Sequence, residues 1–153
     1  MNTLAPVRHT ISTTSALLRF SGLYLALPQQ EILAIEAMAE IDPHEAEPHS
    51  IGWLTHAQQR WPVYCLSAEL ALLTAVPGER RVCVLLGAED GCVGIVCDEI
   101  SIEQTLDQRH ELPPAMCVPH TPVQGLVVLG EDRIACVSDA TRLAAYVAGA
   151  VVA

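Results

Sequence analysis

The sequence predicts an all-β protein, folded as a barrel or a sandwich of short strands. Short apolar runs rich in Val, Ile and Leu follow one another at close spacing, with turn residues between them, a pattern typical of these folds. Long helical segments do not alternate with the strands, so a Rossmann-type sheet is not expected. Hydrophobic residues make up 51% of the chain and aromatic residues only 4%. The core is therefore built from small aliphatic side chains and Cys, which suit small barrels.

The first predicted elements form a hairpin. Residues 17–20 and 23–27 are predicted to form two short strands, and Ser21-Gly22 between them is a two-residue turn signal. Pro28 ends the second strand. Residues 31–41 fit either a short helix or a strand that follows a single helical turn.

The middle of the chain begins with an acidic, proline-containing stretch, residues 42–50, which we expect to be an exposed loop. Residues 51–54 and 61–66 are predicted strands that flank a polar stretch, residues 55–60. Residues 67–73 are predicted to form a short helix, with the serine at their start as its N-cap.

The next hairpin is the clearest local signal. Residues 82–86 and 93–96 are apolar runs, with Asp90-Gly91 between them. Residues 77–80 form a turn before this hairpin and are the best candidate for a subdomain junction. Residues 100–106 are predicted to form another strand.

The last part of the chain starts with a proline-rich loop between residues 113 and 122. Residues 123–129 and 134–137 are predicted to pair as a final hairpin around residues 130–132. Asp139 then caps a C-terminal helix.

The predicted organisation is a single domain over residues 16–147. It is preceded by a loose leader, residues 1–15, and followed by a tail, residues 148–153. Within the domain we expect subdomains at roughly residues 16–76 and 77–147, with the first and last strands shared between them.

The charge excludes some partners. The formal net charge is −10, so phosphate and anionic lipid surfaces repel the chain, and we expect neither nucleic-acid binding nor membrane insertion. The apolar run at residues 143–153 is about half of the ~20 residues that span a bilayer. Residues 10–15 are polar where a signal peptide needs its apolar region. We therefore expect a cytoplasmic protein.

Catalytic patterns are missing. The carboxylate pairs Glu89-Asp90 and Asp98-Glu99 are adjacent in strand or turn segments, so their side chains diverge, and turn chemistry and surface charge explain them better than an acid/base dyad. The sequence holds neither a Gly-x-Ser-x-Gly motif nor a glycine-rich phosphate loop. We therefore expect no enzymatic activity and no cofactor.

Cysteines and histidines leave one alternative open, a small metal- or thiol-dependent protein. His44, His49 and His56 lie near one another in sequence, but their spacing matches no standard zinc site. Most of the six cysteines lie in apolar runs, where a free thiol packs as a small hydrophobe. Cys92 and Cys97 fall on opposite faces of one predicted strand, so they cannot form a disulfide with each other.

Both tryptophans, Trp53 and Trp61, flank the polar stretch at residues 55–60. Tryptophan is enriched at the energetic centres of protein interfaces. Packing inside a small barrel is the alternative for each of them.

An ordered set of motifs over residues 16–147 resembles the CheW-like domains of bacterial chemotaxis-type signalling. The motifs are Phe20-Ser21-Gly22-Leu23-Tyr24-Leu25-Ala26-Leu27-Pro28 with Ile32 and Ile35, Ile51-Gly52-Trp53-Leu54 with Trp61-Pro62-Val63-Tyr64-Cys65-Leu66, Gly94-Ile95-Val96-Cys97-Asp98-Glu99-Ile100, and Val123-Gln124-Gly125-Leu126 with Ile134 and Asp139.

The resemblance implies two small five-stranded SH3-like barrels, side by side around a hydrophobic groove, with short helices and a C-terminal helix. It implies a non-enzymatic adaptor that couples a chemoreceptor to a CheA-type histidine kinase, or that binds another CheW-like domain, in a chemotaxis-like or pilus-motility pathway. A purely structural role as an oligomerisation unit in an array is a further alternative.

The chain departs from the family at the centre of this pattern. Members typically carry Asn-Leu-Arg-Gly where this chain has Thr55, His56, Ala57 and Gln58, and the aspartate common after the proline is Cys65. The partner choice is therefore expected to be altered. The candidate partner-binding residues are Trp53, His56, Ala57, Gln58, Trp61 and Val63.

Overall fold

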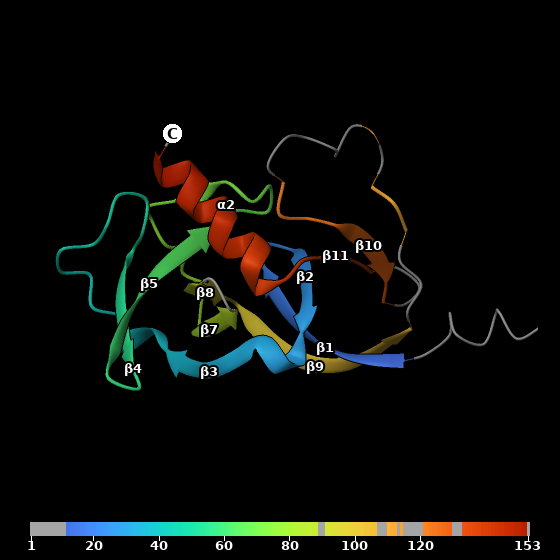
Figure 1. The fold of residues 1–153 in the computed structure, drawn as a ribbon, viewed down its shortest axis with the longest axis horizontal. Helices are drawn as coiled ribbons and strands as arrows, with labels where there is room; N and C mark the ends of the chain where they lie inside the picture. The colour runs from blue at the N-terminus through green and yellow to red at the C-terminus, as the bar shows by residue number, and fades with distance from the viewer. Residues whose placement is uncertain are drawn as a thin grey trace, which may run out of the picture.

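The computed structural model describes residues 12–88, 91–106, 110–112, 114, 121–129 and 133–152, and these residues form two β-sheets and one long helix (Figure 1). The strands are β1 (Ser12–Phe20), β2 (Leu23–Pro28), β3 (Ile32–Ala37), β4 (Gly52–His56), β5 (Gln59–Leu66), β6 (Leu72–Leu73), β7 (Val82–Ala88), β8 (Gly91–Cys97), β9 (Glu99–Leu106), β10 (Gly125–Val128) and β11 (Ile134–Val137). The helices are the short 3-10 turns η1 (Gln29–Glu31) and η2 (Met38–Glu40) and the α-helix α2 (Ala140–Val152).

The middle of the chain forms one sheet, and its two ends together form the other. Sheet A has the order β10-β11-β2-β1-β9, and sheet B has the order β3-β7-β8-β5-β4, with β6 paired to β5. The predicted all-β fold of two small barrels is confirmed. A boundary at residues 76/77 does not separate the sheets, because β7 and β8 complete the sheet that β3 to β6 begin.

The hairpin of β1 and β2 forms as predicted. Ser21 and Gly22 have φ values of 52° and 83°, and positive values at both positions are those of a type I′ turn, whose twist suits a tight hairpin. Strand β1 begins at Ser12, inside the predicted leader, because it pairs with β9 from Ser12↔Leu106 to Arg19↔Glu99. A long-range partner therefore extends the strand into a polar segment that shows no local apolar pattern.

Two further predictions depended on local pattern. Of the two alternatives for residues 31–41, the structure has the strand: η1 is followed by β3 and then by η2. The hairpin of β7 and β8 also forms, and its last pair is Ala88↔Gly91. The residues of that turn, 89–90, lie outside the described residues, as do residues 130–132 and most of the loop at 113–120.

The helix predicted at residues 67–73 is wrong. Ser67 does act as a local cap, since its Oγ accepts hydrogen bonds from the backbone N–H of Glu69 at 3.2 Å and of Ala71 at 3.1 Å. Leu70, however, has a φ of 65°, which breaks a helix. Its side chain is 8% exposed, and the chain turns there so that Leu72 and Leu73 pair with β5 as β6.

The C-terminal helix has the predicted cap. Asp139 Oδ1 accepts a hydrogen bond from the Arg142 N–H at 2.8 Å, and Glu31 Oε1 accepts one from the Ala140 N–H at 2.7 Å. Both carboxylates also face the positive end of the helix dipole. Helix α2 continues to Val152, so the predicted tail at residues 148–153 is helical over most of its length.

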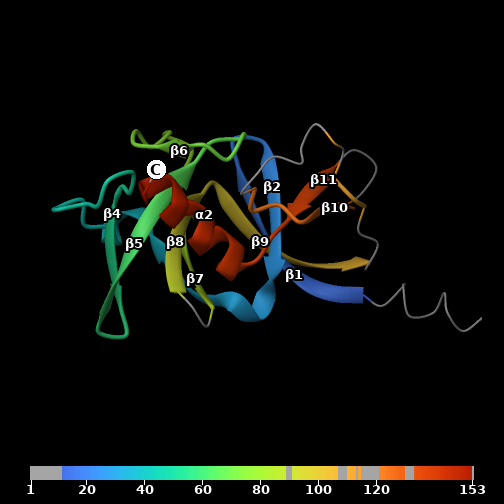
Figure 2. The same cartoon turned by 45° about the horizontal axis from the view of Figure 1, so that its top comes forward.

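One central core holds the two sheets and the helix together. Figure 2 shows α2 lying between sheet B and sheet A on one side of the molecule. The buried residues of this central core come from both sheets and from α2, and include Leu18, Leu25, Val84, Ile95 and Leu143. Sheet B encloses a second cluster around Leu54, Trp61 and Val63, and sheet A encloses a smaller one of Leu17, Ala26, Val127, Ala135 and Val137.

A buried arginine links the two sheets. The Arg80 guanidinium lies 3.0 Å from Asp98 Oδ1, 3.1 Å from Ser21 Oγ and 2.7 Å from the Leu66 carbonyl oxygen. Ser21 belongs to the β1–β2 turn, Leu66 ends β5, and Asp98 lies where the chain passes from β8 to β9. The prediction of surface charge for Asp98 is therefore wrong, since its side chain is 10% exposed and that of Arg80 is fully buried.

Candidate functional site

The β4–β5 hairpin presents several of the predicted partner-binding residues at its tip. The strands run further than predicted, to the pairs Thr55↔Arg60 and His56↔Gln59, so most of the polar stretch is strand. Ala57 and Gln58 form the two-residue turn with φ values of 51° and 66°. Both are exposed, and both occupy the left-handed region without being glycine, which costs free energy.

Trp53 is half-buried on the outer face of this hairpin. Its Nε1 donates a hydrogen bond to the Glu45 carbonyl oxygen at 2.9 Å, which fastens the acidic loop to β4. The Arg60 guanidinium lies 4.5 Å from the centre of the Trp53 ring, within the range of a cation–π contact. The loop itself projects at the left of Figure 1, beside β4 and β5.

Trp61 and Val63 do not lie at the surface, although the sequence analysis named them as partner-binding candidates. Trp61 is 5% exposed and Val63 is fully buried, and both pack inside sheet B. Paired residues of antiparallel strands share a face. Trp61 is paired with Leu54, and Trp53 with Pro62, so the two tryptophans point to opposite faces of one hairpin.

The three histidines predicted as alternative metal ligands do not converge. His56 Nδ1 lies 4.0 Å from Glu36 Oε2 and so connects β4 with β3, whereas His44 Nε2 lies 3.8 Å from Glu45 Oε1 on the exposed loop. His49 is on the same loop, with a φ of 69°. Within the described residues, no three His, Cys, Asp or Glu side chains are grouped so that they could hold a metal ion.

Four of the described cysteines, Cys65, Cys83, Cys97 and Cys136, are buried thiols. Burial raises the pKa of Cys83 and of Cys97 to about 12, because a thiolate loses its hydration inside the core. Burial also raises the pKa of Cys65, although the nearby Arg80 opposes the shift, and the pKa of Cys136. A thiol role needs a stabilised thiolate, which these surroundings disfavour. Cys117 lies outside the described residues.

Sequence reasoning missed a set of exposed apolar residues that we call the apolar rim: Leu33 and Ile35 on β3 and Ile102 on β9, which are 46%, 49% and 48% exposed. Ile35 is paired with Val84 and Ile102 with Ala16, and both partners belong to the central core. Ile35 therefore lies on the core-facing side of sheet B, on its outer strand β3. Ile102 lies on the core-facing side of sheet A, on its outer strand β9.

Figure 1 shows the strands that carry the rim, β3 and β9, running together with β1 along the side of the molecule away from α2. Leu33 lies over β7, since a Cβ atom at Gly87 would come within 2.5 Å of its Cδ1. The sequence does carry a signal for the rim, because β3 reads ILAIEA with apolar residues on both faces. A strand of this kind either is buried on both faces or leaves one apolar face for a partner.

The segment that carries Leu33 and Ile35 is acidic. From Glu31, just before β3, through the loop that ends at residue 50, it carries six carboxylates and no Lys or Arg. These are Glu31, Glu36, Glu40, Asp42, Glu45 and Glu47. A partner that covers this side therefore gains on-rate and specificity if it brings positive charge around an apolar centre.

Comparisons with known proteins agree with this architecture. A family model described as CheW-like domain matches residues 16–147. Among solved structures, the chain is similar to the crystal structure of the scaffolding protein TtCheW from Thermoanaerobacter tengcongensis. The TM-score is 0.66 at 11% identity, with 84% of this chain and 89% of that chain covered. At this identity the likeness shows the fold alone. No curated protein matches the chain, and no described helix is both long and apolar enough to cross a membrane.

Proposed function

The chain belongs to the CheW-like domain family, and we propose that it is a non-enzymatic adaptor of chemotaxis-type signalling, in a chemotaxis or pilus-motility pathway. Its partners are a CheA-type histidine kinase and a chemoreceptor, or a second CheW-like domain. The family match over residues 16–147 is the observation that carries this proposal. The related fold of a protein described as a scaffolding protein is consistent with it.

An adaptor needs two separate surfaces, and the molecule offers two. The apolar rim of Leu33, Ile35 and Ile102 offers exposed apolar side chains on the outer strands β3 and β9, which suit an apolar segment of one partner. The hairpin tip forms the second surface, with Trp53 as its anchor and Ala57-Gln58 at its apex. Trp61 and Val63 support this hairpin from inside.

The altered turn gives the second surface a different chemistry from that of the family. Ala57 stands where members carry an arginine, so a partner contact through a guanidinium is replaced by one through a methyl group. The Arg60 guanidinium, which lies over the Trp53 ring, is the positive charge closest in sequence to the turn of this hairpin. We therefore assign this chain a partner whose contact at the apex is apolar or neutral rather than acidic.

The test is a titration of the full chain with two fragments from its own cell, the regulatory domain of a CheA-type kinase and the cytoplasmic part of a chemoreceptor. We expect Ile35→Glu to abolish binding of one fragment and Trp53→Ala to weaken binding of the other by ~2 kcal/mol or more. Ile134→Glu is the matched control, because Ile134 is an equally exposed apolar strand residue, at 57%, on β11 of sheet A.

The outcomes separate the parts of the proposal. If neither fragment binds, the signalling role is wrong while the fold stands. If both fragments bind and Ile35→Glu behaves like Ile134→Glu, the apolar rim is not the docking surface. Unchanged affinity in a folded Trp53→Ala variant refutes the anchor at the hairpin.

A further inference from the structure

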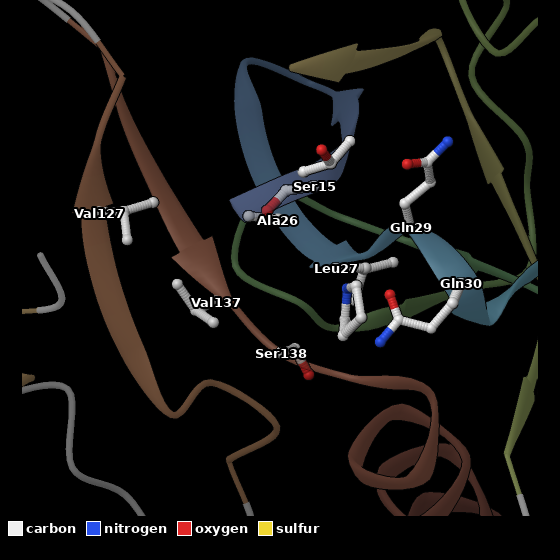
Figure 3. Close-up of a pocket in the computed structure, with 10 residues that line it drawn as sticks. Ser15, Ala26, Leu27, Gln29, Gln30, Val127, Val137 and Ser138 are labelled. Atoms are coloured by element: carbon white, nitrogen blue, oxygen red, sulfur yellow. The ribbon is translucent and has the colours of Figure 1, made fainter. Parts of the chain in front are cut away.

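Sheet A contains an open cavity at the mouth of its barrel. The cavity measures about 450 Å³ and lies where β1, β2, β10 and β11 meet (Figure 3). Its apolar wall is made by Ala26, Val127 and Val137, each at most 6% exposed. These side chains are small, whereas a tryptophan packs inside sheet B. Ligand sites of this size occur at the mouths of β-barrels.

The described polar groups that line the cavity carry no formal charge. Thr14 and Ser15 come from β1, and Gln29 and Gln30 come from η1. Figure 3 shows both glutamine side chains at one side of the cavity, opposite Val127 and Val137. Ser138 Oγ already donates a hydrogen bond to the Pro122 carbonyl oxygen at 2.7 Å. A charged ligand would lose its hydration here without a counter-charge, so the lining favours a neutral one.

The backbone beside the cavity explains what kind of neutral ligand fits. Strands β1 and β2 pair only as far as Ser15↔Pro28, whereas β1 continues to Ser12 along β9. After Pro28 the chain leaves the sheet through η1. Over residues 12–14, β1 therefore has a strand neighbour on one side only among the described strands. Backbone groups that point to the other side have no ladder partner among the described strands, which makes this edge a template for an added strand.

We propose that this cavity binds a short, uncharged, extended segment of a partner protein as an added strand beside residues 12–14. The segment's backbone completes the ladder that β2 leaves unfinished. One small apolar side chain enters the space between Ala26, Val127 and Val137, and the amides of Gln29 and Gln30 hydrogen-bond to the backbone that leaves the sheet. This site is separate from the apolar rim and does not depend on the adaptor role.

The test is a nuclear magnetic resonance titration of the full chain with the acetylated and amidated peptide Val-Thr-Val-Thr-Val. We expect the backbone amide signals of Thr14, Ala26 and Val137 to shift. The same peptide with N-methylated central residues cannot pair as a strand and should bind at least tenfold more weakly. Thr14→Trp places a bulky side chain at the open mouth of the cavity and should also weaken binding at least tenfold.

Thr55→Trp is the matched control, because it places the same bulk on an exposed strand position of the other barrel and should leave peptide binding unchanged. Ile35→Glu should likewise leave it unchanged, which separates this site from the adaptor surfaces. Absence of shifts at millimolar peptide overturns the proposal. Equal binding of the N-methylated peptide overturns it too, since the cavity would then take a neutral side chain or small molecule without pairing.

Discussion

Replacing Asp98 by alanine removes the counter-charge of a fully buried arginine. The Arg80 guanidinium is held by Asp98, by Ser21 Oγ and by the Leu66 carbonyl oxygen, and its side chain has no exposed surface. In Asp98→Ala only the two neutral acceptors remain, and water cannot reach the charge without opening the junction between the sheets. The Ser21 N–H also loses its acceptor, Asp98 Oδ2, at 3.2 Å.

For these reasons Asp98→Ala is expected to lower the free energy of unfolding by a large amount. Breaking a buried ion pair by removing one partner costs about 3–5 kcal/mol, against a total stability of about 5–15 kcal/mol for a domain. Replacing both charges, in Arg80→Met/Asp98→Ala, should cost less than Asp98→Ala alone, because no unpaired buried charge is left. The Arg80 Nε, which has no hydrogen-bond partner, also disappears in the double variant.

Urea denaturation at constant pH measures these free energies of unfolding, and the adjacent pair Arg19–Glu99 supplies the control. Its side chains are 39% and 62% exposed and its nitrogen–oxygen distance is 3.4 Å, so Glu99→Ala should cost less than about 1 kcal/mol. The reasoning is refuted if Asp98→Ala is no more destabilising than Glu99→Ala. It is also refuted if the double variant is less stable than Asp98→Ala.

Two further predictions concern stability. Gln58→Gly should raise the free energy of unfolding by about 1 kcal/mol, because glycine adopts the positive φ of 66° at that turn position without steric cost; a thermal melt showing destabilisation would contradict this. The raised pKa values of Cys83 and Cys97, about 12 in the folded protein against 9.0 ordinarily, make stability fall as the pH rises from about 9 toward 12. Above pH 9 the unfolded chain holds fewer protons than the folded one. Urea titrations at pH 8 and pH 10.5 should show a smaller loss for a Cys83→Ser/Cys97→Ser variant than for the unaltered chain.

Local signals account for the parts of the fold that could be predicted. The β1–β2 and β7–β8 hairpins join strands that are neighbours in sequence, so short apolar runs and turn residues suffice to predict them. The extension of β1 and the division into sheets depend on the pairing of β1 with β9, from Ser12↔Leu106 onward. Register between such distant segments is set by packing, and no local pattern encodes it.

The candidate site shows the same limit at the level of single side chains. Both tryptophans flank the polar stretch at residues 55–60, and from the sequence alone either of them could be buried or exposed. Which one is buried depends on the location of the turn, because a shift of one residue exchanges the faces of a strand. With the turn at Ala57-Gln58, Trp61 is paired with Leu54 and faces inward. The charges Arg80 and Asp98 could not be matched either, because their contact requires the crossing from β8 to β9.

The arrangement of the two sheets along the chain has a consequence for the proposed adaptor role. Sheet A is made from both ends of the chain and sheet B from its middle. Because strands of both sheets pack into the central core, unfolding of one sheet would expose core residues of the other. The central core draws buried residues from both sheets and from α2, and the Arg80 cluster fixes the junction where the chain crosses between them. The apolar rim spans outer strands of both sheets, whereas the hairpin tip belongs to sheet B alone. Their relative position is therefore set by the same contacts that hold the domain folded. Asp98→Ala should for this reason weaken binding at the rim, which needs both sheets in place, more than binding at the hairpin tip.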